Sequence, residues 1–262
     1  MRMITCLVSA LVAASPALAQ QTVAPGNSSL HLDRIRPYTD TITLLVTPPD
    51  SAQRVYGSLV RRVERASDGE TPVFRETQHY VLESGEQQEV DTLDVSATTL
   101  APVRVVENGV KARHTLRLDR GRLVGTEWLA DSGERPVDAP VAAPFFHGMT
   151  TEALIAALPL AEGQSLRLPV GETPHPTVRL NEFRVTGRVT LRTAAGPEEC
   201  LVVQESKTTV AWISAATRHL VRLHWTLPNG TSVWKLPRRD APFASATDLA
   251  VAARLAAPGD HS

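Results

Sequence analysis

Between Thr41 and Ala130 the sequence alternates short strand-forming runs with turns, and this regularity constrains the fold more than any other feature. Seven such runs lie in this stretch, with a turn after roughly every 8 to 12 residues. Asn108-Gly109, between two of the runs, is the residue pair most typical of a tight hairpin. A crossover between parallel strands needs about a dozen or more residues, which these turns do not provide. The pattern predicts an antiparallel meander and excludes a doubly wound α/β fold.

The expected strands of this first half are apolar or alternating runs that end at Gly, Pro, Asp or Asn. They cover residues 41–47, 54–63, 74–83, 88–97, 101–107, 111–119 and 122–130. The run 111–119 alternates most cleanly, because His114, Leu116 and Leu118 share one face while the arginines between them share the other. This alternation predicts a sheet with one buried face.

The strand pattern is interrupted between Asp131 and Gly163. A Pro/Ala-rich segment that contains Phe145, Phe146 and His147 reads as a loop. A short amphipathic helix is then expected over residues 151–158, with Leu154, Ile155 and Leu158 on one face. Pro159 ends this helix.

Strands resume after the helix, at residues 164–170, 177–193, 200–206, 208–214, 219–225 and 231–236. The whole pattern gives about twelve strands and one interior helix. One short helix cannot cover so many strands, so the sheet must curve on itself to bury its apolar face. The predicted fold class is mainly β, a single curved antiparallel sheet forming a half-barrel or open barrel, with the helix as its lid or plug.

The first residues have the composition of a secretory signal peptide. Arg2 provides a positive start, residues 4–14 are nearly all apolar, and Ala17-Leu18-Ala19 is a small-x-small cleavage motif. The apolar run is too short to span a hydrocarbon core of about 30 Å. We therefore expect cleavage after Ala19, a periplasmic or secreted protein, and no integral membrane segment after cleavage. Four parts follow: a signal peptide at 1–19, a flexible leader at 20–37, the β-rich half-barrel domain at 38–236 and a Pro/Ala-rich C-terminal tail at 237–262.

Cysteine usage and charge limit the chemistry further. Of the two cysteines, only Cys200 remains after cleavage, so no internal disulfide is expected, and its apolar surroundings favour a buried, inert thiol. The formal net charge of −1 excludes a strongly basic nucleic-acid binder. Arg184, Arg188 and Arg192 fall on one face of a strand, and they fit a water-facing surface better than an anion site, although both readings stay open.

A search for catalytic motifs finds no G-x-S-x-G, no H-E-x-x-H, no paired zinc-binding cysteines and no glycine-rich phosphate loop. Asp91 and Asp94 are three residues apart on an expected strand, so they face opposite sides and do not form an acid/base pair. His147, beside two phenylalanines, is the remaining candidate, although a loop histidine is more often solvated than catalytic. No catalytic residue, metal or cofactor is therefore predicted.

The interior of the curved sheet is the place where a ligand could bind. Small barrels are often filled by side chains, so a cavity is not a necessary consequence of the fold. The ligand-lining residues that we expect are the large apolar side chains near the helix or on strands. They are Trp128, Phe145, Phe146, Leu154, Ile155, Leu158 and Trp212.

Three short motifs carry a resemblance to a known family: T-L-x-P at residues 99–102, L-P-L-x-x-G at 158–163 and W-x-S-x-x-T-R-x-L-V-R at 212–222. With the secretory start, they make the chain, over residues 40 to 236, resemble a family of uncharacterised bacterial periplasmic proteins similar to the LolA/LolB-like lipoprotein carriers. The resemblance implies an incomplete antiparallel barrel around a helical lid, with an apolar interior that receives acyl chains in the carriers. No lipoprotein-binding residue can be carried over to this chain.

Three functions remain open from the sequence. The first is a periplasmic, non-enzymatic protein that binds or carries an apolar or amphipathic ligand such as a lipid or acyl chain. The second is a structural or interaction protein of the cell envelope, with a filled β core and an envelope protein as its partner. The third is a hydrolase that uses His147. The missing catalytic motifs favour the first two.

Overall fold

A computed structural model describes residues 20–82, 87–109, 111–148, 151–174, 177–193 and 195–239. The expected signal peptide with Ala19, and residues 240–262 of the expected tail, lie outside the described residues. Within these ranges the strands join into one sheet of 16 strands.

The first half of the chain supplies nine strands. They are β1 (Gln21–Thr22), β2 (Tyr38–Thr47), β3 (Arg54–Asp68), β4 (Thr71–Leu82), β5 (Gln87–Ser96), β6 (Pro102–Asn108), β7 (Ala112–Asp119), β8 (Arg122–Leu129) and β9 (Gly133–Pro140). From β2 to β9 each strand pairs antiparallel with the next along the chain. The meander that the turn spacing predicts is confirmed.

The second half contains the helix and seven strands. They are β10 (Phe146–His147), α1 (Thr151–Ala157), β11 (Ser165–Gly171), β12 (Arg179–Thr193), β13 (Gly196–Gln204), β14 (Thr209–Ser214), β15 (Leu220–Thr226) and β16 (Ser232–Arg239). The strands from β11 to β16 form a second antiparallel meander, and β16 pairs with β2 to join the two halves. The short strands β1 and β10 pair parallel with β11.

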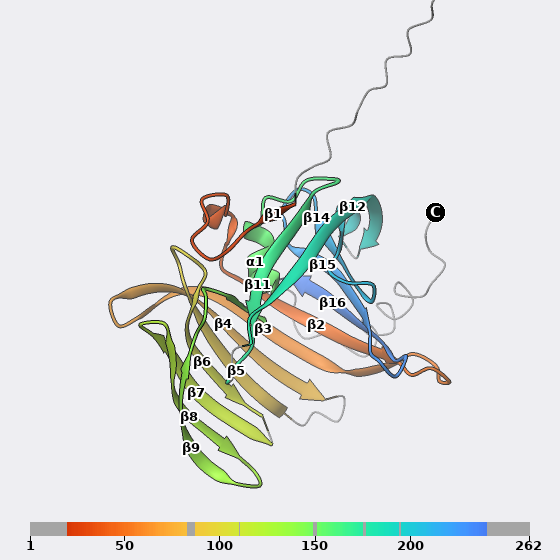
Figure 1. Ribbon diagram of the computed structural model, residues 1–262. Helices are drawn as coiled ribbons and strands as arrows, with labels where there is room; N and C mark the ends of the chain where they lie inside the picture. Colours follow the sequence, from red (N-terminus) through yellow and green to blue (C-terminus); the bar gives the residue numbers. More distant parts are fainter. Residues whose placement is uncertain are drawn as a thin grey trace, which may run out of the picture.

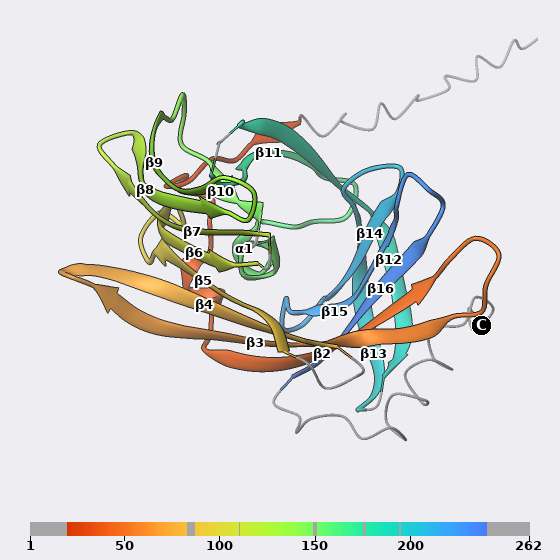
Figure 2. The same ribbon diagram turned by 90° about the horizontal axis from the view of Figure 1, so that it is seen from below.

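The sheet is open and curved, as the sequence predicts. Strands β9 and β1 stand at opposite ends of the strand order and do not pair with each other. Seen from below, the two meanders bend around α1, which lies on the concave side (Figure 2). In Figure 1, β2 and β3 run across the middle of the view, with β12, β14 and β15 above them and β6 to β9 below. Among the described residues, α1 is the only α-helix, and no helix is long and apolar enough to cross a membrane.

Strand β9 corrects the expectation of a loop after residue 130. It pairs with β8 along its whole length, from Arg122 opposite Pro140 to Leu129 opposite Gly133. Its two prolines, Pro136 and Pro140, made the segment look unlike a strand. They are compatible with this position because β9 is an edge strand, and proline cannot donate a ladder hydrogen bond on a paired side.

Residues 20–37 differ from the flexible leader that the sequence suggests. Strand β1 pairs with β11, and a short 3-10 helix, η1 (Leu32–Arg34), follows. Val23 and Ile35 are fully buried in the main hydrophobic core. These two apolar side chains anchor a segment whose composition is otherwise polar.

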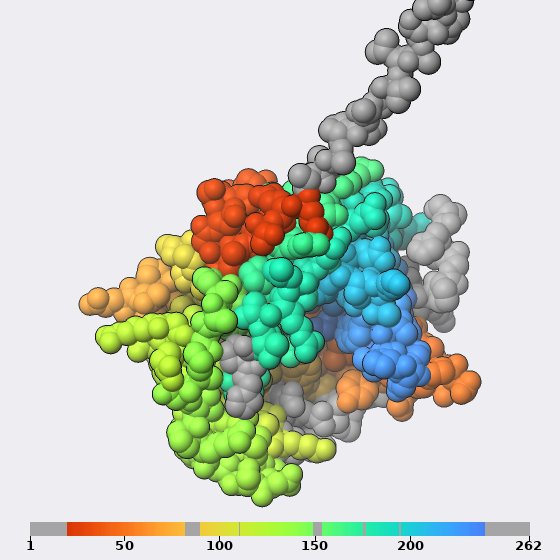
Figure 3. All heavy atoms as spheres, viewed as in Figure 1, coloured from red at the N-terminus to blue at the C-terminus, as the bar shows by residue number. Residues whose placement is uncertain are grey.

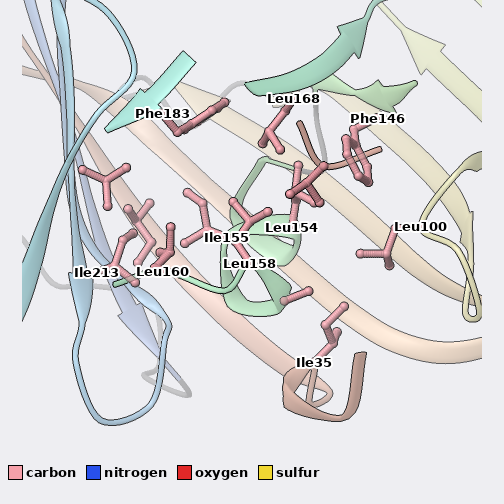
Figure 4. Close-up of a cluster of buried hydrophobic side chains, with 14 of the residues drawn as sticks. Ile35, Leu100, Phe146, Leu154, Ile155, Leu158, Leu160, Leu168, Phe183 and Ile213 are labelled. Atoms are coloured by element: carbon pink, nitrogen blue, oxygen red, sulfur yellow. The ribbon is translucent and has the colours of Figure 1, made fainter. Parts of the chain in front are cut away.

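The main core surrounds α1. Leu154, Ile155 and Leu158 of the helix are buried in one cluster with Phe146, Phe183 and other strand residues (Figure 4). Burying each leucine stabilises the fold by about 1.5–3 kcal/mol, so the helix contributes substantially to the core. Of the two roles that the sequence allows, lid or plug, the packing of α1 is that of a plug.

Candidate functional site

A cavity of about 410 Å³ lies beside α1 on the concave side of the sheet. The space-filling view shows a recess between the yellow-green strands of the first half and the teal-to-blue strands of the second half (Figure 3). The lining residues come from both meanders, from α1 and from the segments next to β10 and β11. They are Gln78, Tyr80, Glu107, His147, Gly148, Ile155, Glu172, Thr173, Phe183, Val203, Glu205, Thr209, Ala211, Leu220, Leu223 and Lys235.

One wall of the cavity is apolar. It consists of Ile155 from the helix and of Phe183, Val203, Ala211, Leu220 and Leu223 from β12 to β15. The strand residues occupy the inward phase of their strands, because the directly paired residues of antiparallel neighbours, such as Val203 and Ala211, point to the same face. The cavity therefore opens within the hydrophobic core itself.

A second wall contains Glu107, His147 and Thr173, which form a polar cluster with His114. Glu107 is the last residue but one of β6, His114 lies opposite it on β7, His147 ends β10, and Thr173 follows β11. Thr173 Oγ1 lies 2.9 Å from His114 Nε2 and 3.1 Å from His147 Nε2, and it donates a hydrogen bond of 3.3 Å to Glu107 Oε1. His114 Nε2 is also 3.2 Å from Glu107 Oε2. The cluster connects β6, β7, β10 and the end of β11.

Burial and neighbouring charges have opposite effects on the pKa values of His147 and Glu107 in this cluster. Burial lowers the pKa of His147 to about 4, against a weaker opposing effect of the Glu107 charge, so this imidazole is neutral near pH 7. Burial also disfavours the charged form of Glu107, but the hydrogen bond and charge of His114, together with His147 and Thr173, hold its pKa below the ordinary value. Glu107 is therefore an anion that its neighbours stabilise.

A third group of polar side chains lies on β2, β3, β4 and β16. Tyr80 Oη donates to Gln78 Oε1 at 3.1 Å, and Gln78 Nε2 donates to Glu76 Oε1 at 2.6 Å. Lys235 lines the same cavity and is half-buried, and burial together with the charge of Arg61 lowers its pKa to about 8. Burial raises the pKa of Glu76, despite the attraction of Arg61.

Glu205 brings a further carboxyl group to the cavity. It follows β13, and its Oε1 accepts a hydrogen bond of 3.1 Å from Asn181 Nδ2. Burial raises the pKa of Glu205, and the amide of Asn181 compensates only in part. In the described part of the chain no cationic side chain forms an ion pair with Glu205.

The structure places the residues that the sequence singled out in three different environments. Ile155 lines the cavity. Phe146, Leu154 and Leu158 lie in the adjoining core, and Phe145 is fully buried against Gly171. These four residues support the cavity without lining it.

The two tryptophans lie on the opposite face of the sheet. Trp128 pairs with Arg113, whose guanidinium lies 5.0 Å from the indole ring centre, whereas the inward residues here are His114 and Glu127. Trp212 stacks on Trp234 with 5.9 Å between ring centres, next to the inward Ala211. Side-chain size suggested an interior position for both, but strand alternation turns them outward.

His147 also differs from the expected solvated loop histidine, since it is only 3% exposed and belongs to β10. Its partners Glu107, His114 and Thr173 were not predicted from the sequence. The alternation of His114 with Leu116 and Leu118 was a signal that this imidazole faces inward. The hairpin signal at Asn108-Gly109 places β6 beside β7, but no local pattern could indicate that Thr173 and His147 meet these two strands.

Other candidates lie apart from the cavity. Arg184, Arg188 and Arg192 are exposed, and Arg188 pairs with Glu199 at 2.6 Å and with Glu162 at 3.3 Å. The thiol of Cys200 is buried, and burial raises its pKa to about 11, which disfavours a reactive thiolate. Within the described ranges, no group of three or more His, Cys, Asp or Glu side chains is arranged to hold a metal ion.

The fold and the cavity define a class of protein in which an open, curved antiparallel sheet encloses a helix and a mixed apolar and polar cavity. The chain belongs to the family DUF3108, described as a protein of unknown function, whose match covers residues 71–236. This match confirms the expected membership of an uncharacterised family. No curated protein matches the chain.

Three solved structures are similar to this chain at low sequence identity. A protein described as exported, with a YmcC-like fold, from Bacteroides fragilis is 12% identical and has a TM-score of 0.32; the match covers 77% of this chain and 95% of the other. A protein described as a lipoprotein, from Parabacteroides distasonis, is 8% identical with a TM-score of 0.32 and coverage of 78% and 94%. A DUF1329 family protein from Desulfovibrio piger is 10% identical with a TM-score of 0.25 and coverage of 84% and 93%.

Proposed function

We propose that this chain is a periplasmic, non-enzymatic protein that binds an amphipathic ligand in the cavity beside α1. The observation that carries the proposal is the cavity itself, about 410 Å³ with one apolar and one polar wall. Small-molecule sites typically have volumes of roughly 300–1,000 Å³, apolar walls and a few polar groups that orient the ligand. The periplasmic location rests on the signal-peptide composition of residues 1–19.

The two walls suggest how the ligand would lie. An alkyl or acyl portion fits against Phe183, Val203 and Ala211, where it would replace water on apolar surface. A polar head fits among the carboxyl, hydroxyl and amide groups on the facing side. There it can form hydrogen bonds with these side chains, which an apolar group could not form.

The geometry of the polar cluster supports a binding role over a hydrolytic one. In a Ser-His-Asp relay, the histidine faces the nucleophile with one ring nitrogen and the acid with the other. Here Thr173 Oγ1 and Glu107 Oε1 both lie near the same atom, His147 Nε2, at 3.1 and 3.8 Å. This arrangement holds the cluster together and does not align a proton relay through the ring.

The test measures binding of the neutral apolar probe N-phenyl-1-naphthylamine by fluorescence to residues 20–262. Ala211→Trp and, separately, Thr209→Trp would fill the apolar side of the cavity, because both residues line it. Leu180→Trp is the matched control on β12, where the side chain is 60% exposed. We expect both cavity-filling variants to fold and to bind the probe at least about tenfold more weakly. Equal binding by the wild type and both folded cavity variants would contradict the proposal.

A further inference from the structure

The charge of the cavity wall is unbalanced. Its lining carboxyl groups are those of Glu107, Glu172 and Glu205, and its basic lining groups are the ammonium of Lys235 and the imidazole of His147. His147 is neutral near pH 7 because of its burial. Carboxylates therefore outnumber cations on the surface that would face a ligand.

The single lysine does not offset this excess. Lys235 lies over the ring of Trp225, with 5.9 Å from Nζ to the ring centre, and it is attracted by the charge of Glu76. The neighbouring Arg61 pairs with Asp40 at 2.7 Å, so the charges on this side of the cavity already have opposite charges beside them. An anionic head placed here would also approach Glu76, whose side chain is buried at the same place.

Glu205 is the carboxyl group best placed to receive a cation. It lines the cavity one residue beyond β13, close to the apolar residues Val203 and Ala211 of the same wall. Among the described residues, the hydrogen bond to its side chain comes from the neutral amide of Asn181. A ligand ammonium at this point would supply the charge-assisted hydrogen bonds that a half-buried carboxylate requires.

We infer that the ligand is a single-chain amphiphile with a cationic, hydrogen-bond-donating head. Its ammonium binds at Glu205, and its alkyl chain lies along the apolar wall that contains Phe183 and Ala211. This inference rests on the proposed function and adds the sign of the head group. The selectivity arises from like-charge repulsion as well as attraction, because an anionic head of the same length would face the same carboxylates.

The experiment compares three probes of equal chain length, octylamine, octanol and octanoate, by calorimetric titration of residues 20–262 at pH 7. We expect octylamine to bind roughly tenfold or more tightly than octanoate, with octanol between them. Glu205→Gln should weaken octylamine about tenfold and leave octanol unchanged, since it removes the charge and keeps the shape. Glu199→Gln is the matched control, because this exposed carboxylate of β13 pairs with Arg188 outside the cavity.

The outcomes distinguish a failure of the cationic head group from a failure of the proposed ligand-binding function. Tighter binding of octanoate than of octylamine, or an unchanged octylamine affinity in Glu205→Gln, would overturn the cationic head and leave the amphiphile-binding function intact. If none of the three probes nor the neutral apolar probe binds to the folded protein, the proposed function itself fails, and the inference with it.

Discussion

Gly171 lies directly against the ring of Phe145, so that a Cβ atom at position 171 would come within 2.6 Å of Phe145 Cδ2. This contact fixes the end of β11 against the segment that leads through β10 to α1. Phe145 is fully buried, and the next residues, Phe146 and His147, pair with Val170 and Gly171. One glycine thus allows the close approach that positions both the helix and the polar cluster.

Replacing Gly171 by a larger residue is expected to lower the stability of the fold. Gly171→Ala should destabilise the fold by about 1–3 kcal/mol, because the added methyl group overpacks a closed site. Chemical denaturation of the variant measures the loss. Phe145→Leu in the same chain should recover part of it, since a smaller side chain leaves room. Gly187→Ala on β12, where a Cβ would meet nothing within 4 Å, should change the stability by less than about 0.5 kcal/mol. A similar loss of stability in Gly171→Ala and Gly187→Ala would contradict the close contact between Gly171 and Phe145.

The helix should behave as part of the core. Leu158 is fully buried among the residues around α1, so Leu158→Ala should cost about 2–5 kcal/mol of unfolding free energy. Leu180→Ala removes the same atoms at a site that is 60% exposed and should cost less than about 0.5 kcal/mol. Thermal and urea unfolding of both variants compare the two sites. A cost below about 1 kcal/mol for Leu158→Ala would show that α1 is a detachable lid.

The ion pair between Arg61 and Asp40 should depend on both partners. Both side chains are about 1% exposed, and Arg61 Nη2 donates to Asp40 Oδ2 at 2.7 Å. Asp40→Asn removes the carboxylate that is hydrogen-bonded to a buried guanidinium, so we expect a loss of about 3–5 kcal/mol. Asp138→Asn breaks a pair of the same length with Arg122 on the exposed face of β8 and β9 and should cost far less, because solvent screens an exposed ion pair. Urea denaturation checks both, and a small loss in Asp40→Asn would show that solvent reaches the buried pair.

Because His147 is buried as a neutral imidazole, the fold should become less stable in mild acid. Its pKa is about 4 when folded, against 6.5 for an ordinary histidine, so the unfolded chain binds the extra proton first as the pH falls. The free energy of unfolding should therefore decrease as the pH falls from about 6.5 to 4. This group contributes up to about 1.4 kcal/mol per pH unit to the decrease. The lowered pKa of Glu107 acts in the same direction, but only below its own unfolded value.

The measurement is the unfolding free energy of the wild type and of His147→Gln from pH 7 to pH 5. His147→Gln lacks the titrating ring and should show a shallower slope over this range. His31→Gln is a suitable control, because that histidine precedes η1 outside the cavity and is not fully buried. Parallel slopes for wild type and His147→Gln would contradict the burial of a neutral imidazole.

The sequence predicted the architecture well because the relevant signals are local. Turn residues such as Asn108-Gly109 and the alternation in β7 determine strand lengths and pairing with the next strand. Pro159 ends the helix just beyond Ala157. The prediction was wrong at β9, where Pro136 indicated a loop although edge strands accept proline.

The site was predicted less well because it depends on contacts between distant segments. Glu107 and Thr173 are separated by 66 positions, yet they share a hydrogen bond. Trp128 and Trp212 were chosen as interior residues by size, and the strand phase places them outside. Ile155 lies on the buried face of α1, and its contact with the cavity is a property of the assembled sheet.

Native mass spectrometry of residues 20–262, purified gently from a periplasm, tests the central claim of ligand binding most directly. We expect a reproducible additional mass on the folded protein that is lost on denaturation, absent from Ala211→Trp and retained by Leu180→Trp. The mass and fragmentation of the released molecule would identify its chemical class. A bound mass that persists in folded Ala211→Trp, or a wild-type protein without any bound mass that also fails to take up added octylamine, octanol or octanoate, would contradict the account.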